Sequence, residues 1–247
     1  MRRKHNFIVG TGRQTSVLYD TYDTAHRELR SRTRHAMTLL FLFLVIFAVL
    51  GLRPVSRQDW LLENVLVFVT LPILMLTSSR FRFSNTSYTF LFAFLVLHEV
   101  GAHYTYSQVP YDEWLSNTYG VTLAQWFGLR RNHYDRLIHF AYGLLLLFPL
   151  IELMRLVAPV RGWWKYVQPV ALILAGSALY ELIEWGAAAV FGGELGIAYV
   201  GTQGDEWDAQ KDMACACAGA VLALLVLSVQ LTVPVSRRSS VSRHPCS

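Results

Sequence analysis

Long uninterrupted apolar runs are the feature of this chain that most restricts its fold. A helix of about 17–25 apolar residues crosses a hydrocarbon core roughly 30 Å thick, because each residue adds about 1.5 Å along the helix axis. The sequence predicts about six such spans, at Ala36–Leu52, Trp60–Ser79, Ser84–Tyr106, Leu137–Leu156, Val167–Phe191 and Asp212–Val233. We therefore expect an all-α, polytopic transmembrane helical bundle.

The composition supports a membrane protein over a soluble helical bundle. Hydrophobic residues make up 53% of the chain and charged residues only 16%, which leaves too few polar side chains to cover a soluble domain. The run Met37–Leu52 has no polar stripe that would face water. Because the last four runs contain ionisable residues, one of them has an alternative interpretation as a re-entrant or interfacial segment.

The basic residues predict the orientation of the chain. With six spans both termini lie on one side, and that side carries sixteen of the 22 Lys and Arg residues, which predicts cytoplasmic termini. The expected organisation is a basic arm (1–35), a transmembrane domain (36–233) and a basic tail (234–247). The net charge of +5 is explained by these tails and short loops, so no nucleic-acid partner is expected.

Small and aromatic residues within the spans have structural interpretations. Tryptophans near the ends of spans are typical of the membrane interface, as at Trp60, Trp163, Trp164 and Trp207. Small residues permit close helix contacts, and we expect this of Gly101, Ala102, Gly143, Gly176, Ser177, Ala178, Gly219 and Ala220.

Ionisable side chains gather where four spans reach the same predicted membrane face. Alternating directions place there the end of the third span, the start of the fourth, the outer half of the fifth and the start of the sixth. The histidines and carboxylates at these positions are His98, Glu99, His103, His133, Asp135, His139, Glu181, Glu184, Asp205, Asp208 and Asp212. Hydrophobic periodicity does not generate such a convergence, so it is the main functional signal.

The charges at this face do not balance. Seven carboxylates meet four cations, Arg130, Arg131, Arg136 and Lys211, so the surplus requires protons or a divalent cation. Four histidines favour a metal, since mixed imidazole and carboxylate ligation suits zinc, manganese or iron; no organic cofactor is indicated. The predicted metal ligands are His98, Glu99, His103, His133, Asp135, His139, Asp205, Asp208 and Asp212.

Other interpretations of this convergence stay open. A histidine inside a membrane often makes an interhelical hydrogen bond, and Asp208 with Lys211 or Asp135 with Arg131 would form structural ion pairs. Neither the zinc-binding HExxH motif nor the di-iron Glu-x-x-His pair is present. Proton-linked carboxylates and a purely structural polar network are therefore alternatives to a metal.

Four polar strings in the chain resemble the YjdF family of bacterial inner-membrane proteins. They are His98-Glu99, the segment 131–136 (RNHYDR), the segment 180–185 (YELIEW) and the segment 201–212 (GTQGDEWDAQKD). The resemblance spans roughly residues 36–230 and implies a multi-pass protein of the bacterial inner, or cytoplasmic, membrane. It implies no particular reaction.

A weaker resemblance to the VanZ-like membrane proteins begins at Asp135. It consists of Asp135-x-x-x-His139-Phe140, the pair Glu181 and Glu184, and Asp208-x-x-x-Asp212 before Gly219. This chain has Asp212 where that family has Asn and Glu184 where Gln is common, so its site would be more acidic. The resemblance therefore implies a helical core and leaves any shared activity in doubt.

Three functions are compatible with these observations. In a metal-dependent membrane enzyme, Glu181 or Glu184 would act as a general base and Arg131 or Arg136 would clamp an anionic, lipid-linked substrate at the outer leaflet. A proton- or cation-coupled transporter would instead use Glu181 and Glu184 along its pathway. A non-catalytic sensor or assembly factor would bind a partner through the outer loops. Membrane lipids are the one general partner expected, and no oligomeric state is predicted.

Overall fold

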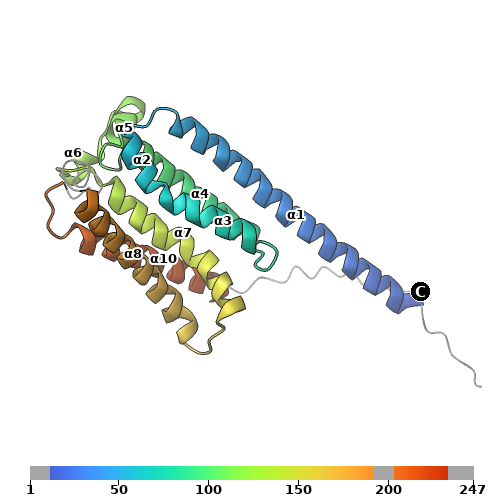
Figure 1. Ribbon diagram of the computed structural model, residues 1–247. Coiled ribbons are helices and arrows are strands. Elements are labelled where there is room, and N and C mark those ends of the chain that lie inside the picture. The colour runs from blue at the N-terminus through green and yellow to red at the C-terminus, as the bar shows by residue number, and fades with distance from the viewer. Residues whose placement is uncertain (1–11, 192–202, 233–247) are drawn as a thin grey trace, which may run out of the picture. The chain divides into compact units, whose positions relative to one another are not determined.

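The computed structural model describes residues 12–191 and 203–232, and every regular element in these ranges is a helix (Figure 1). The helices are α1 (Gly12–Gly51), α2 (Arg57–Glu63), α3 (Val65–Thr77), α4 (Asn85–His103), α5 (Tyr111–Tyr119), α6 (Leu123–Phe127), α7 (Tyr134–Val157), α8 (Trp164–Phe191) and α10 (Asp208–Thr232). This confirms the all-α prediction. The predicted tail 234–247, the first 11 residues of the basic arm and part of the last loop, which was predicted to face outward, lie outside the described residues.

Five stretches of helix in the described residues are long and apolar enough to cross a membrane. They are His26–Gly51, Arg57–Thr77, Tyr134–Val157, Trp164–Val190 and Asp208–Ser228. The remaining predicted span coincides with α4, a helix of 19 residues that is not among these five. The chain is thus a multi-pass helical membrane protein, while the count of six spans and the side of the termini stay predictions.

Several helices begin earlier than their apolar runs. The first helix starts at Gly12 instead of Ala36, and α10 starts at Asp208 instead of Asp212. Hydropathy marks the part of a helix that suits the hydrocarbon core, whereas backbone hydrogen bonds and caps set where the helix begins. Polar residues near the membrane face therefore belong to helical turns, which restricts where their side chains point.

The chain forms two compact units, Met1–Tyr104 and Thr105–Ser247. In the first unit α4 packs along α1, and Phe43, Val67 and Leu95 form a buried apolar cluster. Helix α4 begins at Asn85 and is capped by Ser84, whose hydroxyl accepts from the Ser87 N–H at 3.1 Å. This apolar cluster joins α1, α3 and α4.

The second unit is built around close packing between α7 and α10. Gly143 on α7 lies against the backbone of Ala216 and Ala220, and Gly219 on α10 lies against the backbone of Phe140. This confirms that Gly143, Gly219 and Ala220 serve helix contact. In chain order α8 lies between α7 and α10 and runs in the opposite direction to both, so α7 and α10 run in the same direction. Their first turns therefore meet.

Candidate functional site

The lead-in to α7 is held by the side chain of Asn132. Its Oδ1 accepts from the Tyr134 N–H at 3.0 Å, which satisfies a backbone donor at the start of the helix. Its Nδ2 donates to the Val109 carbonyl at 2.8 Å, and the Tyr111 hydroxyl accepts from the His133 N–H at 3.0 Å. These contacts position the first turn of α7, which carries Asp135.

The lead-in to α10 is a tight turn at Gln203 and Gly204, whose φ angles of 47° and 83° are both left-handed. Asp205 follows, and its Oδ1 accepts from the Trp207 N–H two residues on, at 3.1 Å. The helix then starts at Asp208. Asp205 therefore precedes the helix, whereas Asp208 and Asp212 lie one turn apart on it.

Two amide groups join these lead-ins directly. The Asn132 N–H donates to Gln203 Oε1 at 3.0 Å, and Gln203 Nε2 donates to the Asn132 carbonyl at 3.1 Å. Because the pair is reciprocal, it sets both the distance and the direction between the starts of α7 and α10. Carboxylates placed on the first turns of these helices are thereby brought together.

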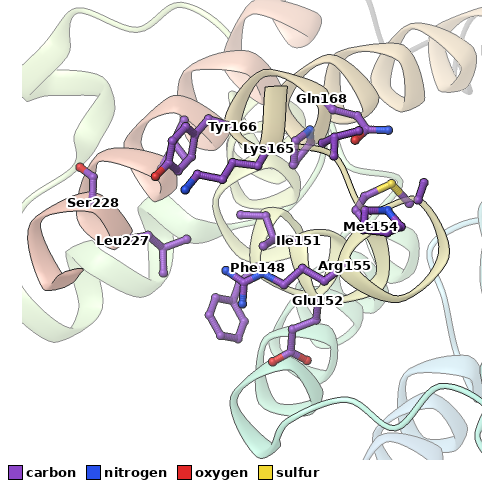
Figure 2. A pocket seen from close by; sticks show the side chains of 15 residues that line it. Phe148, Ile151, Glu152, Met154, Arg155, Lys165, Tyr166, Gln168, Leu227 and Ser228 are labelled. Carbon is purple, nitrogen blue, oxygen red and sulfur yellow. The ribbon is translucent and has the colours of Figure 1, made fainter. Parts of the chain in front are cut away.

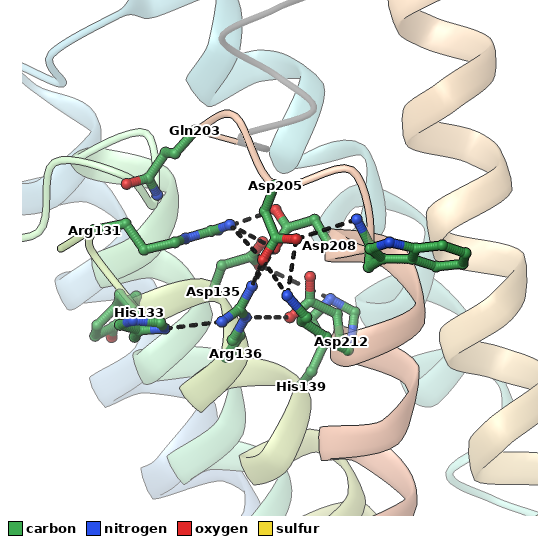
Figure 3. Close-up of polar contacts among 12 residues, drawn as sticks. Arg131, His133, Asp135, Arg136, His139, Gln203, Asp205, Asp208 and Asp212 are labelled. Atoms are coloured by element: carbon green, nitrogen blue, oxygen red, sulfur yellow. Dashed lines mark hydrogen bonds and ion pairs between the residues drawn. The ribbon is translucent and has the colours of Figure 1, made fainter. Parts of the chain in front are cut away.

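A charge network connects the two helix starts (Figure 3). Arg131 donates to both oxygens of Asp208, at 2.7 and 3.0 Å, which is the two-pronged geometry favoured by guanidinium and carboxylate. Arg136 donates to Asp208 at 2.9 Å and to Asp205 at 2.5 Å. Lys211 pairs with Asp205 at 2.6 Å. The arginines, and not Lys211, are thus the partners of Asp208.

Three carboxylates from the two helices converge within this network. Asp135, Asp208 and Asp212 each place an oxygen within 4.8 Å of the others. The Asp212 side chain is 2% exposed, and among the described residues its Oδ1 accepts no hydrogen bond, although Arg136 Nε lies 3.9 Å away. A buried carboxylate oxygen without a donor costs free energy unless a cation or proton satisfies it.

His139 lies beside this carboxylate cluster, one turn beyond Asp135. Its Nε2 is 3.2 Å from Glu181 Oε1 on α8 and 3.8 Å from Asp135 Oδ1, and its Nδ1 is 3.0 Å from the Ser177 hydroxyl. A hydroxyl at Nδ1 orients the ring, so Nε2 faces the two carboxylates. Helices α7, α8 and α10 therefore all supply groups to one cluster.

The two groups of the cluster that lie outside the spans have shifted pKa values. Hydrogen bonds from Lys211 and Arg136 hold the pKa of Asp205 below its usual range. Burial, followed by the charges of Arg136 and Arg131, lowers the pKa of His133 below 6.5. Consistent with a neutral ring, the Arg136 guanidinium lies 3.3 Å from His133 Nδ1 and donates to it.

This shift predicts a pH dependence of stability. The folded pKa of His133 lies below its ordinary value of 6.5, so the unfolded chain binds more protons and stability is lost as the pH falls below 6.5. We expect His133→Asn to flatten the dependence, by at most about 1.4 kcal/mol per pH unit. Thermal unfolding in detergent at a series of pH values measures it. The exposed residue His26 provides the matched control, His26→Asn, and identical profiles for wild type and His133→Asn would contradict the prediction.

Three other predicted site residues belong to the first unit. His98 and Glu99 are buried in the first unit, where His98 bonds the backbone of Glu63 and Glu99 faces Trp60 and Asn64. The ring of His103 bonds the Leu50 carbonyl near the end of α1, at 2.7 Å. Their role as metal ligands stays a prediction.

Glu184 is buried on α8, one turn beyond Glu181. Arg131 and Arg136 are engaged by carboxylates, so a substrate anion would have to displace Asp205 or Asp208. The proposed roles of these groups in catalysis stay predictions.

Three contributors to the site were not identified from the sequence. Asn132 and Gln203 lie within the polar strings 131–136 and 201–212, so the sequence indicated their neighbourhood. It did not predict that the two residues bond to one another. Ser177 was interpreted as a small packing residue, yet its hydroxyl contacts His139. Nothing in the sequence around Ser177 distinguishes a residue that only packs from one whose hydroxyl contacts a histidine.

The comparisons with known proteins agree with the membrane fold. Residues 35–232 match the model of the family described as "Predicted membrane protein (DUF2238)". The "Inner membrane protein YjdF" of Escherichia coli (strain K12) is 34% identical over 203 residues, which cover 82% of this chain and 92% of that protein. No solved structure matches. The YjdF resemblance and the inner-membrane location are confirmed, and the VanZ-like resemblance stays a prediction. The chain belongs to the DUF2238 family of membrane proteins.

Proposed function

We propose that the protein binds a divalent cation between the first turns of α7 and α10. The observation that carries this proposal is the convergence of Asp135, Asp208 and Asp212, whose oxygens lie within 4.8 Å of one another. Carboxylates at this separation repel each other strongly unless a positive charge lies between them. A single ion contacting all three would remove this repulsion.

The charge balance of the network supports a divalent ion. The described network contains five carboxylates and three cations, namely Asp135, Glu181, Asp205, Asp208 and Asp212 against Arg131, Arg136 and Lys211. The surplus of two negative charges equals the charge of one divalent ion. Protonation of two carboxylates would also balance the charge of the network, and a proton-linked function is therefore the second candidate.

The available lone pairs indicate which oxygens would coordinate. A carboxylate has about four acceptor positions, and the arginines occupy three of those on Asp208. Asp135 and Asp212 accept no hydrogen bond from either arginine in the described structure, so they would supply the main ligands, with His139 Nε2 nearby. A site rich in oxygen suits a hard ion, so manganese fits best among the three metals considered.

Metal binding is tested on the purified protein in detergent after removal of bound metal. Titration with Mn²⁺ is expected to show one site, and Asp212→Asn and Asp135→Asn are each expected to weaken it at least about tenfold, since each removes a ligand charge. Glu206→Gln is the matched control, because Glu206 is an exposed carboxylate just before α10, and it should bind like wild type. Folded wild type that binds no Mn²⁺, Zn²⁺ or Fe²⁺ would reject the proposal.

We also propose that the cation acts on a lipid-linked substrate at this membrane face. A divalent ion held by Asp135, Asp208 and Asp212 would supply Lewis-acid chemistry to a substrate oxygen, and Glu181 beside His139 is suited to accept a proton. The test is metal-dependent hydrolysis of a lipid phosphate ester in vesicles. Product that forms equally with Asp212→Asn would rule out catalysis by this cluster.

A proton-linked transporter is the second candidate, and one observation favours it. His139 Nε2 faces Glu181 at 3.2 Å and Asp135 at 3.8 Å, an arrangement in which three groups can share protons. Proteoliposomes loaded with a pH-sensitive dye distinguish the two functions. Proton flux that His139→Gln abolishes, in protein without bound metal, would support transport over metal binding.

A further inference from the structure

A cavity of about 380 Å³ lies between α7, α8 and α10 (Figure 2). Arg155 in its wall is 20 residues after Asp135 on α7, and Ser228 is 20 residues after Asp208 on α10. At about 1.5 Å per residue these separations are roughly 30 Å, the thickness of the hydrocarbon core. The cavity and the carboxylate cluster therefore lie at opposite membrane faces.

The lining of the cavity is divided between apolar walls and a polar edge. Phe148, Ile151, Leu224 and Leu227 contribute apolar surface. The polar lining consists of Glu152, Arg155, Lys165, Tyr166, Gln168 and Ser228, so two cations face one carboxylate. This combination is complementary to an amphiphile that has an anionic end.

The two cations are available for a ligand. Arg155 and Lys165 are both exposed, and neither forms an ion pair with a carboxylate of the described residues. The Lys165 ammonium lies 4.7 Å from the centre of the Tyr166 ring, a cation–π contact that keeps its charge beside the cavity. An anion entering here would meet positive charge without first displacing a protein carboxylate from either side chain.

The neighbouring tryptophans indicate the depth of the cavity in the membrane. Trp163 and Trp164 immediately precede Lys165 and are 62% and 53% exposed. Their rings stack with centroids 4.4 Å apart. Exposed tryptophans at the end of a span lie at the level of the lipid headgroups. The mouth of the cavity is thus at the depth where phospholipid headgroups are present.

We propose that this cavity binds one anionic phospholipid. The phosphate of the headgroup is held by Arg155 and Lys165, and the upper part of an acyl chain lies along Phe148, Ile151 and Leu227. A soluble phosphate ester would satisfy the cations but not the apolar walls, which is why the assignment is to a lipid. The site is independent of the cation site, since none of its lining residues belongs to that cluster.

Native mass spectrometry of the delipidated full-length protein tests the proposal. Phosphatidylglycerol is expected to bind about tenfold more tightly than phosphatidylcholine, and the double variant Arg155→Gln with Lys165→Gln is expected to lose that preference. Arg161→Gln is the matched control, because Arg161 is exposed on the loop between α7 and α8 but does not line the cavity. It should retain the preference, and thermal unfolding confirms that each variant is folded.

Three outcomes would overturn the lipid assignment. The first is equal binding of the two lipids by wild type. The second is an equal loss of preference in Arg161→Gln, which would indicate a diffuse surface charge instead of a cavity. The third is displacement of phosphatidylglycerol by glycerol phosphate at equal concentration, which would show a phosphate site that does not use the apolar walls.

Discussion

Replacing Asp208 with asparagine is expected to destabilise the second unit strongly, by about 3–5 kcal/mol. The change leaves two arginines facing a neutral amide, although their side chains are only 11% and 18% exposed and cannot recover full hydration. Of the three arginine hydrogen bonds that Asp208 accepts, the remaining amide oxygen can keep only those made to a single oxygen, since the NH2 group of asparagine cannot accept from a guanidinium. Unfolding of the purified protein by heat or denaturant in detergent measures the loss.

Two further variants make this prediction specific. Glu206→Gln removes an exposed charge two residues earlier and should change stability by no more than about 0.5 kcal/mol. Arg131→Lys keeps the charge but not the two-pronged contact, so its effect should fall between the two. Wild-type stability in Asp208→Asn would show that the arginines do not depend on this carboxylate.

Gly143→Ala is expected to cost about 1–3 kcal/mol, although alanine is the better helix former by about 1 kcal/mol. A Cβ at this position would overlap the Ala216 carbonyl and the Ala220 backbone nitrogen. Neither is a flexible side chain, so α7 and α10 would have to separate. Separation moves Asp135 away from Asp208 and Asp212, and we therefore expect weaker Mn²⁺ binding together with the loss of stability.

The matched control lies on α8. A Cβ added at Gly186 would meet nothing within 4 Å, so Gly186→Ala should leave stability unchanged or raise it by the helix-propensity difference. Thermal unfolding and Mn²⁺ titration of both variants separate the two contributions. Equal behaviour of Gly143→Ala and Gly186→Ala would show that the α7 and α10 contact is not tight in solution.

Part of the site was predictable because certain residues lie at helix starts. Asp135 and Asp208 occupy first turns, where a carboxylate is favoured by the helix dipole, and the sequence spacing places Asp212 one turn further on. Their convergence follows once α7 and α10 run in the same direction. The alternative of an ion pair between Asp208 and Lys211 is not the pairing observed, since Lys211 bonds Asp205 and the arginines bond Asp208.

Sequence spacing did not resolve these pairings because long side chains reach several partners. From the lead-in to α7, Arg131 can extend to any carboxylate of the α10 start, and only the turn at Gln203 and Gly204 decides which one is near. The contact of Ser177 with His139 likewise depends on how α8 is rotated against α7. Such rotations are set by packing of small residues, which hydropathy does not report.

The apolar runs by themselves determined that this chain is helical and membrane-embedded, because a backbone in hydrocarbon must satisfy its hydrogen bonds within each segment. They also predicted which residues lie near a membrane face. Only the tertiary structure decided that Asp135, Asp208 and Asp212 meet, and that two arginines hold Asp208. The physical reason is the contact at Gly143 and Gly219, where the absence of side chains lets α7 and α10 approach closely enough to bring their first turns together.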